Sequence, residues 1–228
     1  MNPDDIAAMA TMAAALRASG QFKEALTLYE RVGAHEQRDE VAPGRLGRRI
    51  DIACLHWLLD DHPKAVGLMH GLVAGIFDGS IKYGDAAGGM SQGLLLYYMA
   101  ITDGIPEEAT FALTYLKNRV RRTFGQVWPC PVAQYHLGEI TFEVVMEAVN
   151  RQVAAATPLL PEKIELGRRR RLTVALFHDG VRSRAQGDEA RCLVRMRECY
   201  GLENPLIEQE WYLARYEVQN ADSQVRAR

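Results

Sequence analysis

The sequence lacks the features that direct a chain to a membrane, to nucleic acid or to an oxidising compartment. Its formal net charge of −2 over 228 residues predicts no general affinity for nucleic acid or for an anionic membrane surface. No apolar stretch reaches the roughly 20 residues that a membrane span requires, and the acidic start, Met-Asn-Pro-Asp-Asp, lacks the positive charge of a signal peptide. The four cysteines form neither a CxxC pair nor a disulfide framework. We therefore expect a cytoplasmic protein with free thiols.

Recognisable catalytic patterns are also missing. No Ser/His/Asp or Cys/His set is suggested by spacing. Cys192 and Cys199 lie two turns apart on one helix face and are expected to be small core residues; His178 could lie close to them, but nothing in the spacing marks the pair. The glycine-bearing segment 82–93 differs from a phosphate-binding loop, because no Lys-Ser or Lys-Thr follows its glycines and no strand precedes them. We expect neither enzymatic activity nor a cofactor.

What the sequence does contain is a succession of helices. The composition, 48% hydrophobic and 25% charged residues, is that of an ordinary globular protein, and residues 1–228 are expected to form one domain with a polar tail from about 220. Proline and glycine divide the chain into helical lengths, and strict alternation of apolar and polar residues is scarce, so we expect an all-α fold of about ten helices. These helices are expected at about 4–18, 22–33, 45–59, 63–77, 90–103, 106–123, 132–149, 162–185, 188–200 and 205–219, with a further short one near 151–156.

The expected helices should form stacked antiparallel pairs. Each pair has one apolar face too wide to bury alone, and stacking against the next pair completes the burial. The helix expected at 90–103 is apolar nearly all round and should therefore be central. Gly89 and Gly93 leave one side of it thin, so that another helix can approach closely.

A short pattern recurs along the chain: a helical run, a tight turn, then an alanine that opens a second helical run. In the clearest copy, Gly20, Phe22, Ala25 and Tyr29 match the second half of a tetratricopeptide repeat. Weaker copies centre on Ala65, Ala109 and Ala190. The chain thus resembles the tetratricopeptide-like helical-repeat proteins, which implies a right-handed α-solenoid that binds peptides or partner proteins along its concave face.

One acidic stripe stands out. Glu139, Glu143 and Glu147 fall at i, i+4 and i+8 of the helix expected at 132–149, and His136 lies one turn earlier. Carboxylates and an imidazole at this spacing can hold a metal ion, but no second His/Glu pair is visible to complete the ligand set, so we expect no metal. The stripe is then either a solvated face or an acidic patch for a basic partner.

The chain also contains a basic run, Arg168 to Arg171. Four consecutive residues point around a whole helical turn and cannot form one stripe. No aromatic residues interleave with them, as nucleic-acid binding would favour. We expect some of these arginines to pair with acidic groups such as the carboxylates of the acidic stripe, and the others to stay in water.

The leading hypothesis is a non-enzymatic protein-binding module. The chain resembles the compact all-helical immunity proteins of bacterial polymorphic toxin systems, which are small, cytosolic, single-domain and without a catalytic motif. That resemblance implies a toxin domain as the partner, with Glu139 and Glu143 meeting its basic substrate cleft and the bound protein occluding the active site. Neither nucleic acid nor a membrane is expected as a partner, and the oligomeric state stays open.

An adaptor or chaperone of the tetratricopeptide type is the alternative. It would hold an extended peptide in its groove, and the helix expected at 45–59 supplies Arg45, Arg48 and Arg49 as cations that could clamp a carboxylate.

A third hypothesis is a small-molecule enzyme or sensor built around the loop 78–89, whose length makes it the best candidate for a functional loop. It would need a pocket lined by Tyr83, Asp85 and Tyr97. The plainer interpretation is a turn that leads into the following helix, with Asp85 as its cap. Across the three hypotheses, the candidate binding residues are Glu139, Glu143, Glu147, Arg45, Arg48, Arg49, Tyr83 and Asp85.

Overall fold

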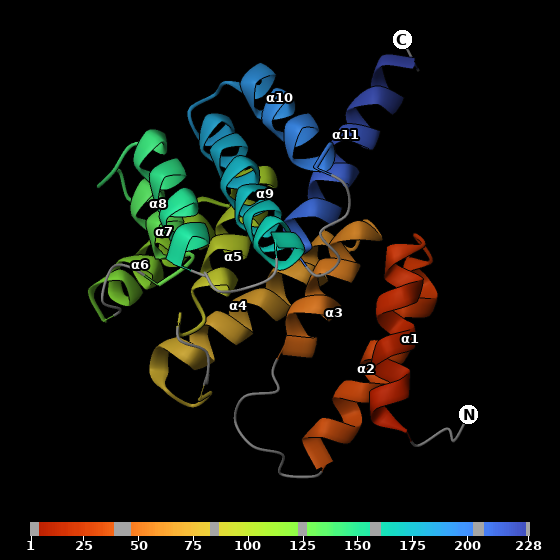
Figure 1. The fold of residues 1–228 in the computed structure, drawn as a ribbon. Coiled ribbons are helices and arrows are strands. Elements are labelled where there is room, and N and C mark those ends of the chain that lie inside the picture. The colour runs from red at the N-terminus through yellow and green to blue at the C-terminus, as the bar shows by residue number, and fades with distance from the viewer. Residues whose placement is uncertain are drawn as a thin grey trace. The chain divides into compact units, whose positions relative to one another are not determined.

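The computed structural model describes residues 5–38, 47–82, 87–122, 127–155, 161–202 and 208–226, and within these ranges all regular structure is helical. The eleven helices of the described ranges are shown in Figure 1. They are α1 (Ile6–Ala18), α2 (Phe22–Arg38), α3 (Gly47–Leu58), α4 (His62–Asp78), α5 (Met90–Thr102), α6 (Pro106–Arg122), α7 (Cys130–His136), α8 (Phe142–Ala155), α9 (Pro161–Ala185), α10 (Glu189–Tyr200) and α11 (Gln209–Arg226). The all-α prediction is confirmed, and none of the described helices is both long and apolar enough to cross a membrane.

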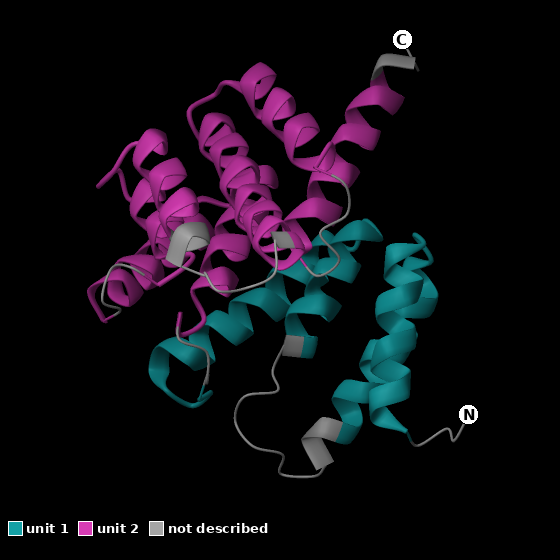
Figure 2. Ribbon diagram, viewed as in Figure 1, with its two compact units in different colours: residues 1–85 teal, residues 86–228 magenta. Residues whose placement is uncertain are grey.

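The chain divides into two compact units, residues 1–85 and residues 86–228 (Figure 2). Unit 1 contains α1 to α4, and unit 2 contains α5 to α11. The single domain expected over residues 1–228 stays a prediction.

Unit 1 is built from two helix pairs, α1 with α2 and α3 with α4 (Figure 1). The first pair turns at Gly20, whose φ of 82° lies in the left-handed region that glycine favours. The alanines that follow the two turns, Ala25 and Ala65, are fully buried, as the repeated pattern predicts. Contacts between α2 and α3 join the two pairs.

Unit 2 is organised around α5 and α9. Helix α5 buries residues on all its sides, which confirms its expected central place. A Cβ atom on Gly93 would lie 2.6 Å from a ring carbon of Tyr115, so α6 packs directly on the side of α5 that the glycine leaves thin. Helix α9, 25 residues long, contacts α5, α7, α8, α10 and α11.

The pair formed by α9 and α10 departs from the alanine pattern. Ala190 is exposed, so it cannot mediate the close approach that the pattern predicts. Gly180 of α9 takes this role, because a Cβ atom there would lie 3.2 Å from the carbonyl oxygen of Cys192. Cys192 and Cys199 of α10 are fully buried, as expected for small core residues.

The prediction of a single helix at 132–149 is wrong, because the structure has two helices there, α7 and α8. Helix α7 ends at His136, and Gly138, with a φ of 75°, turns the chain before α8 begins at Phe142. Glu139 therefore lies in the link between two helices, and only Glu143 and Glu147 share a helix. The short helix predicted near 151–156 is the end of α8 rather than a separate element.

The C-terminal tail also differs from expectation. The polar segment from about 220, expected to be a tail beyond the last helix, continues α11 as far as Arg226. One reason is a tertiary contact: Arg197 of α10 donates a hydrogen bond to Asp222 at 2.8 Å. A polar sequence can thus stay helical where a neighbouring helix supplies a partner for it.

Candidate functional site

In unit 2, two adjacent residues that end α7 meet two adjacent residues in the C-terminal half of α9. The hydroxyl of Tyr135 donates a hydrogen bond to a carboxylate oxygen of Asp179. Next to it, Nε2 of His136 lies 3.2 Å from Nδ1 of His178. The turn at Gly138 ends α7 just beyond these residues, which places Tyr135 and His136 at the end of a helix whose side chains face α9.

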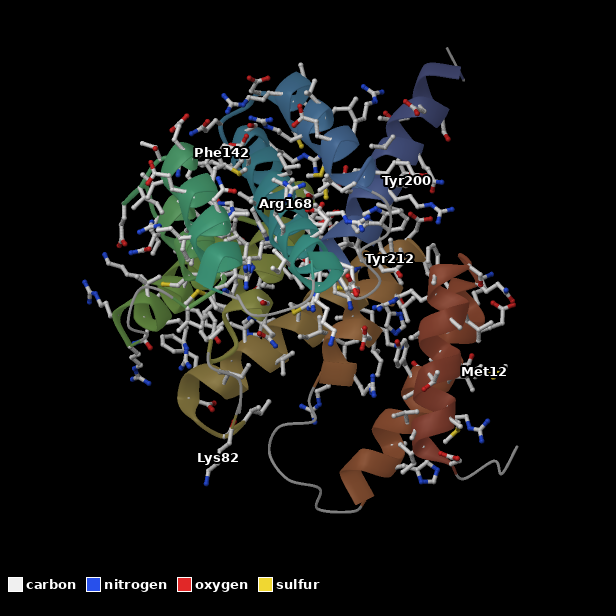
Figure 3. All side chains as sticks on the ribbon, viewed as in Figure 1. Met12, Lys82, Phe142, Arg168, Tyr200 and Tyr212 are labelled. Atoms are coloured by element: carbon white, nitrogen blue, oxygen red, sulfur yellow. The ribbon has the colours of Figure 1, made fainter. Side chains whose placement is uncertain are left out.

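Asp179 is a buried carboxylate held by one hydroxyl and two guanidinium groups. Its side chain has no exposed surface, Arg195 donates to it at 2.6 Å, and Arg191 lies 3.4 Å from it. The guanidinium of Arg195 also lies 5.3 Å from the ring of Phe142, which begins α8 and is labelled in Figure 3. Because burial and the neighbouring carboxylate raise the pKa of Tyr135, this phenol stays a hydrogen-bond donor at neutral pH.

The two histidines are electrically neutral at physiological pH. Burial lowers the pKa of His178 to about 3. Burial, helped by His178 and the positive charge of Arg182, lowers the pKa of His136 well below its usual value. The pair therefore shares one hydrogen bond in which one ring donates and the other accepts.

The outer nitrogen of each ring makes no hydrogen bond with any described residue. Nδ1 of His136 and Nε2 of His178 are both buried and unsatisfied. Nε2 of His178 faces Oε1 of Glu210 at 3.8 Å, which is too long for a hydrogen bond. Glu210 itself is 4% exposed, and burial raises the pKa of its carboxyl above the usual range.

Arg182 adds a positive charge beside the histidines. Its guanidinium carbon lies 4.2 Å from the centre of the Tyr135 ring, a cation–π contact. Its charge lowers the pKa of His136 and opposes the rise in the pKa of Tyr97 and Tyr135. Tyr97 reaches the cluster from α5, with its ring edge-on to His136 at 4.9 Å between centroids.

The thiols near this region are not activated. Cys199 donates a weak hydrogen bond to the carbonyl oxygen of Thr173 at 3.4 Å, and burial raises its pKa well above the usual value. Burial also raises the pKa of Cys192 to about 12. Neither cysteine forms a thiolate near neutral pH, so the arrangement does not supply a sulfur nucleophile.

The three carboxylates of the predicted acidic stripe are all exposed. Glu139 lies in the link before α8, and Glu143 and Glu147 lie on α8 itself. A hydrogen bond with Thr141 lowers the pKa of Glu143. Among the described residues, no cation forms an ion pair with any of these three glutamates.

The basic run does not pair with the acidic stripe, which corrects that expectation. Arg168, labelled in Figure 3, donates two hydrogen bonds to Glu165 at 2.9 and 3.0 Å. Arg170 donates to Glu208 at 2.5 Å. These arginines thus find acids within their own helix or in the segment before α11.

The other predicted binding residues fall into two groups. Arg48 lies 4.0 Å from Asp51 and over the ring of Tyr29, inside unit 1, and Arg49 is half-buried on α3. Outside the described residues lie Arg45, Tyr83 and Asp85.

Sequence reasoning missed most of the cluster between α7 and α9. The sequence does not indicate that His136 and His178 are in contact, because they are 42 residues apart. One signal was present: His178 and Asp179 interrupt the apolar run Val174 to Val181, and polar residues in a buried helix segment require partners. Comparison of the chain with known protein families, curated proteins and solved structures found no match.

Proposed function

We propose that this protein is a non-enzymatic protein-binding module, and specifically an immunity protein that binds a cognate bacterial toxin and occludes its active site. The observation that carries the proposal is the exposed set of Glu139, Glu143 and Glu147, which form no ion pair with a described cation, although the charge of Arg191 helps to lower the pKa of Glu143. We call these three residues the acidic patch.

The acidic patch contrasts with the arginines of the same unit. Arg168, Arg170 and Arg184 each form an ion pair with a glutamate elsewhere. Like charges one helical turn apart cost a few tenths of a kcal/mol, and Glu143 and Glu147 of the acidic patch keep this cost although cations are plentiful in unit 2. A partner with a basic surface would remove it on binding.

Side chains with catalytic chemistry support the non-enzymatic part of the proposal. The two cysteines of α10 keep their protons, since burial raises their pKa. His178 has no exposed surface. Reactive groups that act on substrates lie where a substrate can reach them. The two thiols and the imidazole of His178 are instead buried between packed helices.

The mechanism follows from charge and size. Exposed carboxylates attract a basic surface over a distance of about 10 Å at moderate salt, which speeds the encounter with a cleft that binds an anionic substrate. A bound protein of 25.5 kDa then blocks access to that cleft by its bulk. No residue of the toxin needs to be modified.

The adaptor alternative has less support. The clamp expected for a peptide carboxylate includes Arg48, and this guanidinium is already close to Asp51 and the Tyr29 ring. An arginine that already faces an acid inside its own unit has less to offer a peptide.

Co-expression tests the proposal directly. The candidate toxin is the protein encoded next to the gene for this chain, and its expression alone should arrest growth. We expect the chain to restore growth and to elute with the toxin as a complex of fixed stoichiometry in gel filtration. Absence of both protection and a complex would refute the immunity assignment.

Charge reversal tests the role of the acidic patch. The double substitution Glu143→Lys with Glu147→Lys should slow association about tenfold and weaken its dependence on salt, because electrostatic steering is lost. The matched control, Glu24→Lys with Glu162→Lys, changes the net charge equally at exposed positions elsewhere. If both double variants bind alike, the acidic patch is not the contact surface.

A further inference from the structure

Arg182 is a half-buried cation that forms no ion pair with a described residue. Its neighbours differ: Arg184 pairs with Glu217, and both Arg191 and Arg195 reach Asp179. Asp179 already accepts from Tyr135 as well. The carboxylate of Asp179 lies in the same surroundings but is already held by these three partners, so within the described ranges Arg182 has no ion-pair partner of its own.

Two buried nitrogen atoms near the Tyr135 ring also lack hydrogen-bond partners among the described residues. They are Nη1 of Arg182 and Nδ1 of His136. Both side chains contact the Tyr135 ring, Arg182 at 4.2 Å and His136 at 6.0 Å between ring centroids. A buried polar group without a partner costs about 1–3 kcal/mol, so two such groups on adjoining helices indicate an absent acceptor.

A third donor comes from α5. Tyr97 is 7% exposed, and its ring lies edge-on to His136 at 4.9 Å. Burial raises its pKa, so the phenol keeps its proton at neutral pH and can donate it in a hydrogen bond.

We propose that Arg182, His136 and Tyr97 together bind a carboxylate group, which Nη1 of Arg182, Nδ1 of His136 and the Tyr97 hydroxyl would hold by hydrogen bonds. We call these three residues the carboxylate site.

The charge of the site selects a carboxylate over phosphate. Arg182 contributes one positive charge, and both histidines are neutral because burial lowers their pKa. A monoanion balances that single charge, whereas a phosphate dianion would leave a buried negative charge uncompensated.

The histidine pair can adopt the proton arrangement that the site requires. For Nδ1 of His136 to donate, its Nε2 must accept the proton of His178 Nδ1, and the 3.2 Å contact allows this. Nε2 of His178 then carries no proton, and it faces Oε1 of Glu210 at 3.8 Å. No proton has to be gained or lost by the two rings for a carboxylate to bind.

Nuclear magnetic resonance of histidine-labelled protein gives a direct test. The ¹⁵N signals of His136 are followed while sodium acetate replaces sodium chloride at constant ionic strength. We expect a saturable shift with a Kd of about 1 mM, typical of a small ligand held by few contacts. In Arg182→Gln the Kd should rise about tenfold or more, because a charge-assisted hydrogen bond is lost.

Two further variants make the result decisive. Arg197→Gln removes the same charge from an exposed pair on α10 and should bind acetate like the native protein. Tyr97→Phe leaves every charge in place and should weaken binding about threefold to tenfold, so it decides the question if Arg182→Gln does not fold. A shift that is linear in acetate, or unchanged in Tyr97→Phe and Arg182→Gln, would mean an adventitious ion only and would overturn the proposal.

The source of the carboxylate is distinguished in a second titration. A blocked Gly-Asp-Gly peptide offers the same group on a protein-like chain. Saturation by both probes supports a site that admits a side chain of a partner, and saturation by acetate alone supports a free small carboxylate. Tighter binding of phosphate than of acetate would overturn the assignment to a monoanion.

Discussion

Arg17 and Asp51 form a buried ion pair in unit 1, with Nη1 of Arg17 at 2.5 Å from Oδ1 of Asp51. The two residues are 34 positions apart and link α1 to α3. The Arg17 side chain is 3% exposed, and Arg48 lies 4.0 Å from the second oxygen of the same carboxylate. The pair is therefore a specific contact between the two helix pairs of unit 1.

Removing one member of this pair should destabilise the protein strongly. Arg17→Ala leaves the Asp51 carboxylate buried without its nearest partner, at an expected cost of about 3–5 kcal/mol in the free energy of unfolding. Arg17→Met combined with Asp51→Leu should cost much less, because no buried charge is then left uncompensated. Urea unfolding followed by circular dichroism measures both, with the exposed Lys23→Ala as control. A double variant as unstable as Arg17→Ala would contradict this account.

Acid should weaken unit 2 through its buried histidines. The folded-state pKa values of His136 and His178 are lowered, so below about pH 6.5 the unfolded chain takes up protons that the folded state refuses. For each imidazole, the free energy of unfolding then falls by about 1.4 kcal/mol for every unit by which the pH is lowered. The Asp179 charge favours protonation of His136 and the Arg182 charge opposes it, but burial has the largest effect on the pKa of each histidine.

Glu210 acts in the opposite direction. Its pKa is raised in the folded state, so its contribution to stability is present below its unfolded pKa and is lost as the pH rises through the folded value. His178→Phe should thus flatten the fall in stability between pH 7 and pH 4, and Glu210→Gln should steepen it. Urea unfolding across this range is the measurement, and His70→Gln on α4 is the control. If His178→Phe leaves the fall in stability between pH 7 and pH 4 unchanged, the buried histidine is not its cause.

Buried and exposed ion pairs of the same chemistry should differ in their effect on stability. Arg184 reaches Glu217 at 2.9 Å, and both side chains are 15% exposed or less; Glu217 also accepts a hydrogen bond from Tyr98 at 2.8 Å. Glu217→Ala should cost about 3–5 kcal/mol. Asp222→Ala, which removes the half-exposed partner of Arg197, should cost at most about 1 kcal/mol. Equal losses in thermal and urea unfolding would contradict the distinction.

Adding one methyl group at two different helical glycines should have opposite effects. Gly93→Ala places a Cβ atom 2.6 Å from Tyr115 and 2.9 Å from Leu116, and overpacking of this kind costs about 1–3 kcal/mol. Gly67→Ala on α4 meets nothing within 4 Å and should gain about 0.5–1 kcal/mol from helix propensity. Stabilisation by Gly93→Ala would show that α6 does not need the thin side of α5.

The sequence alone determined most of the helices, because their signals are local. Proline and glycine mark where backbone hydrogen bonding must stop, and periodic apolar residues mark the faces to be buried. The central place of α5 followed from its nearly uniform apolarity, and its packing on α6 from Gly93. Where a local signal was weak, at Gly138, the prediction joined two helices into one and placed Glu139 wrongly.

Only the tertiary structure decided which polar groups meet. Tyr135 and Asp179 are 44 residues apart, and nothing in the local sequence of α7 indicates that its end packs on the C-terminal half of α9. Helix formation depends on neighbours three and four positions away, whereas burial, the pKa shifts of the histidines and the unpaired charge of Arg182 depend on which distant helices exclude water together. The helices could therefore be predicted from the sequence, and the cluster between α7 and α9 could not.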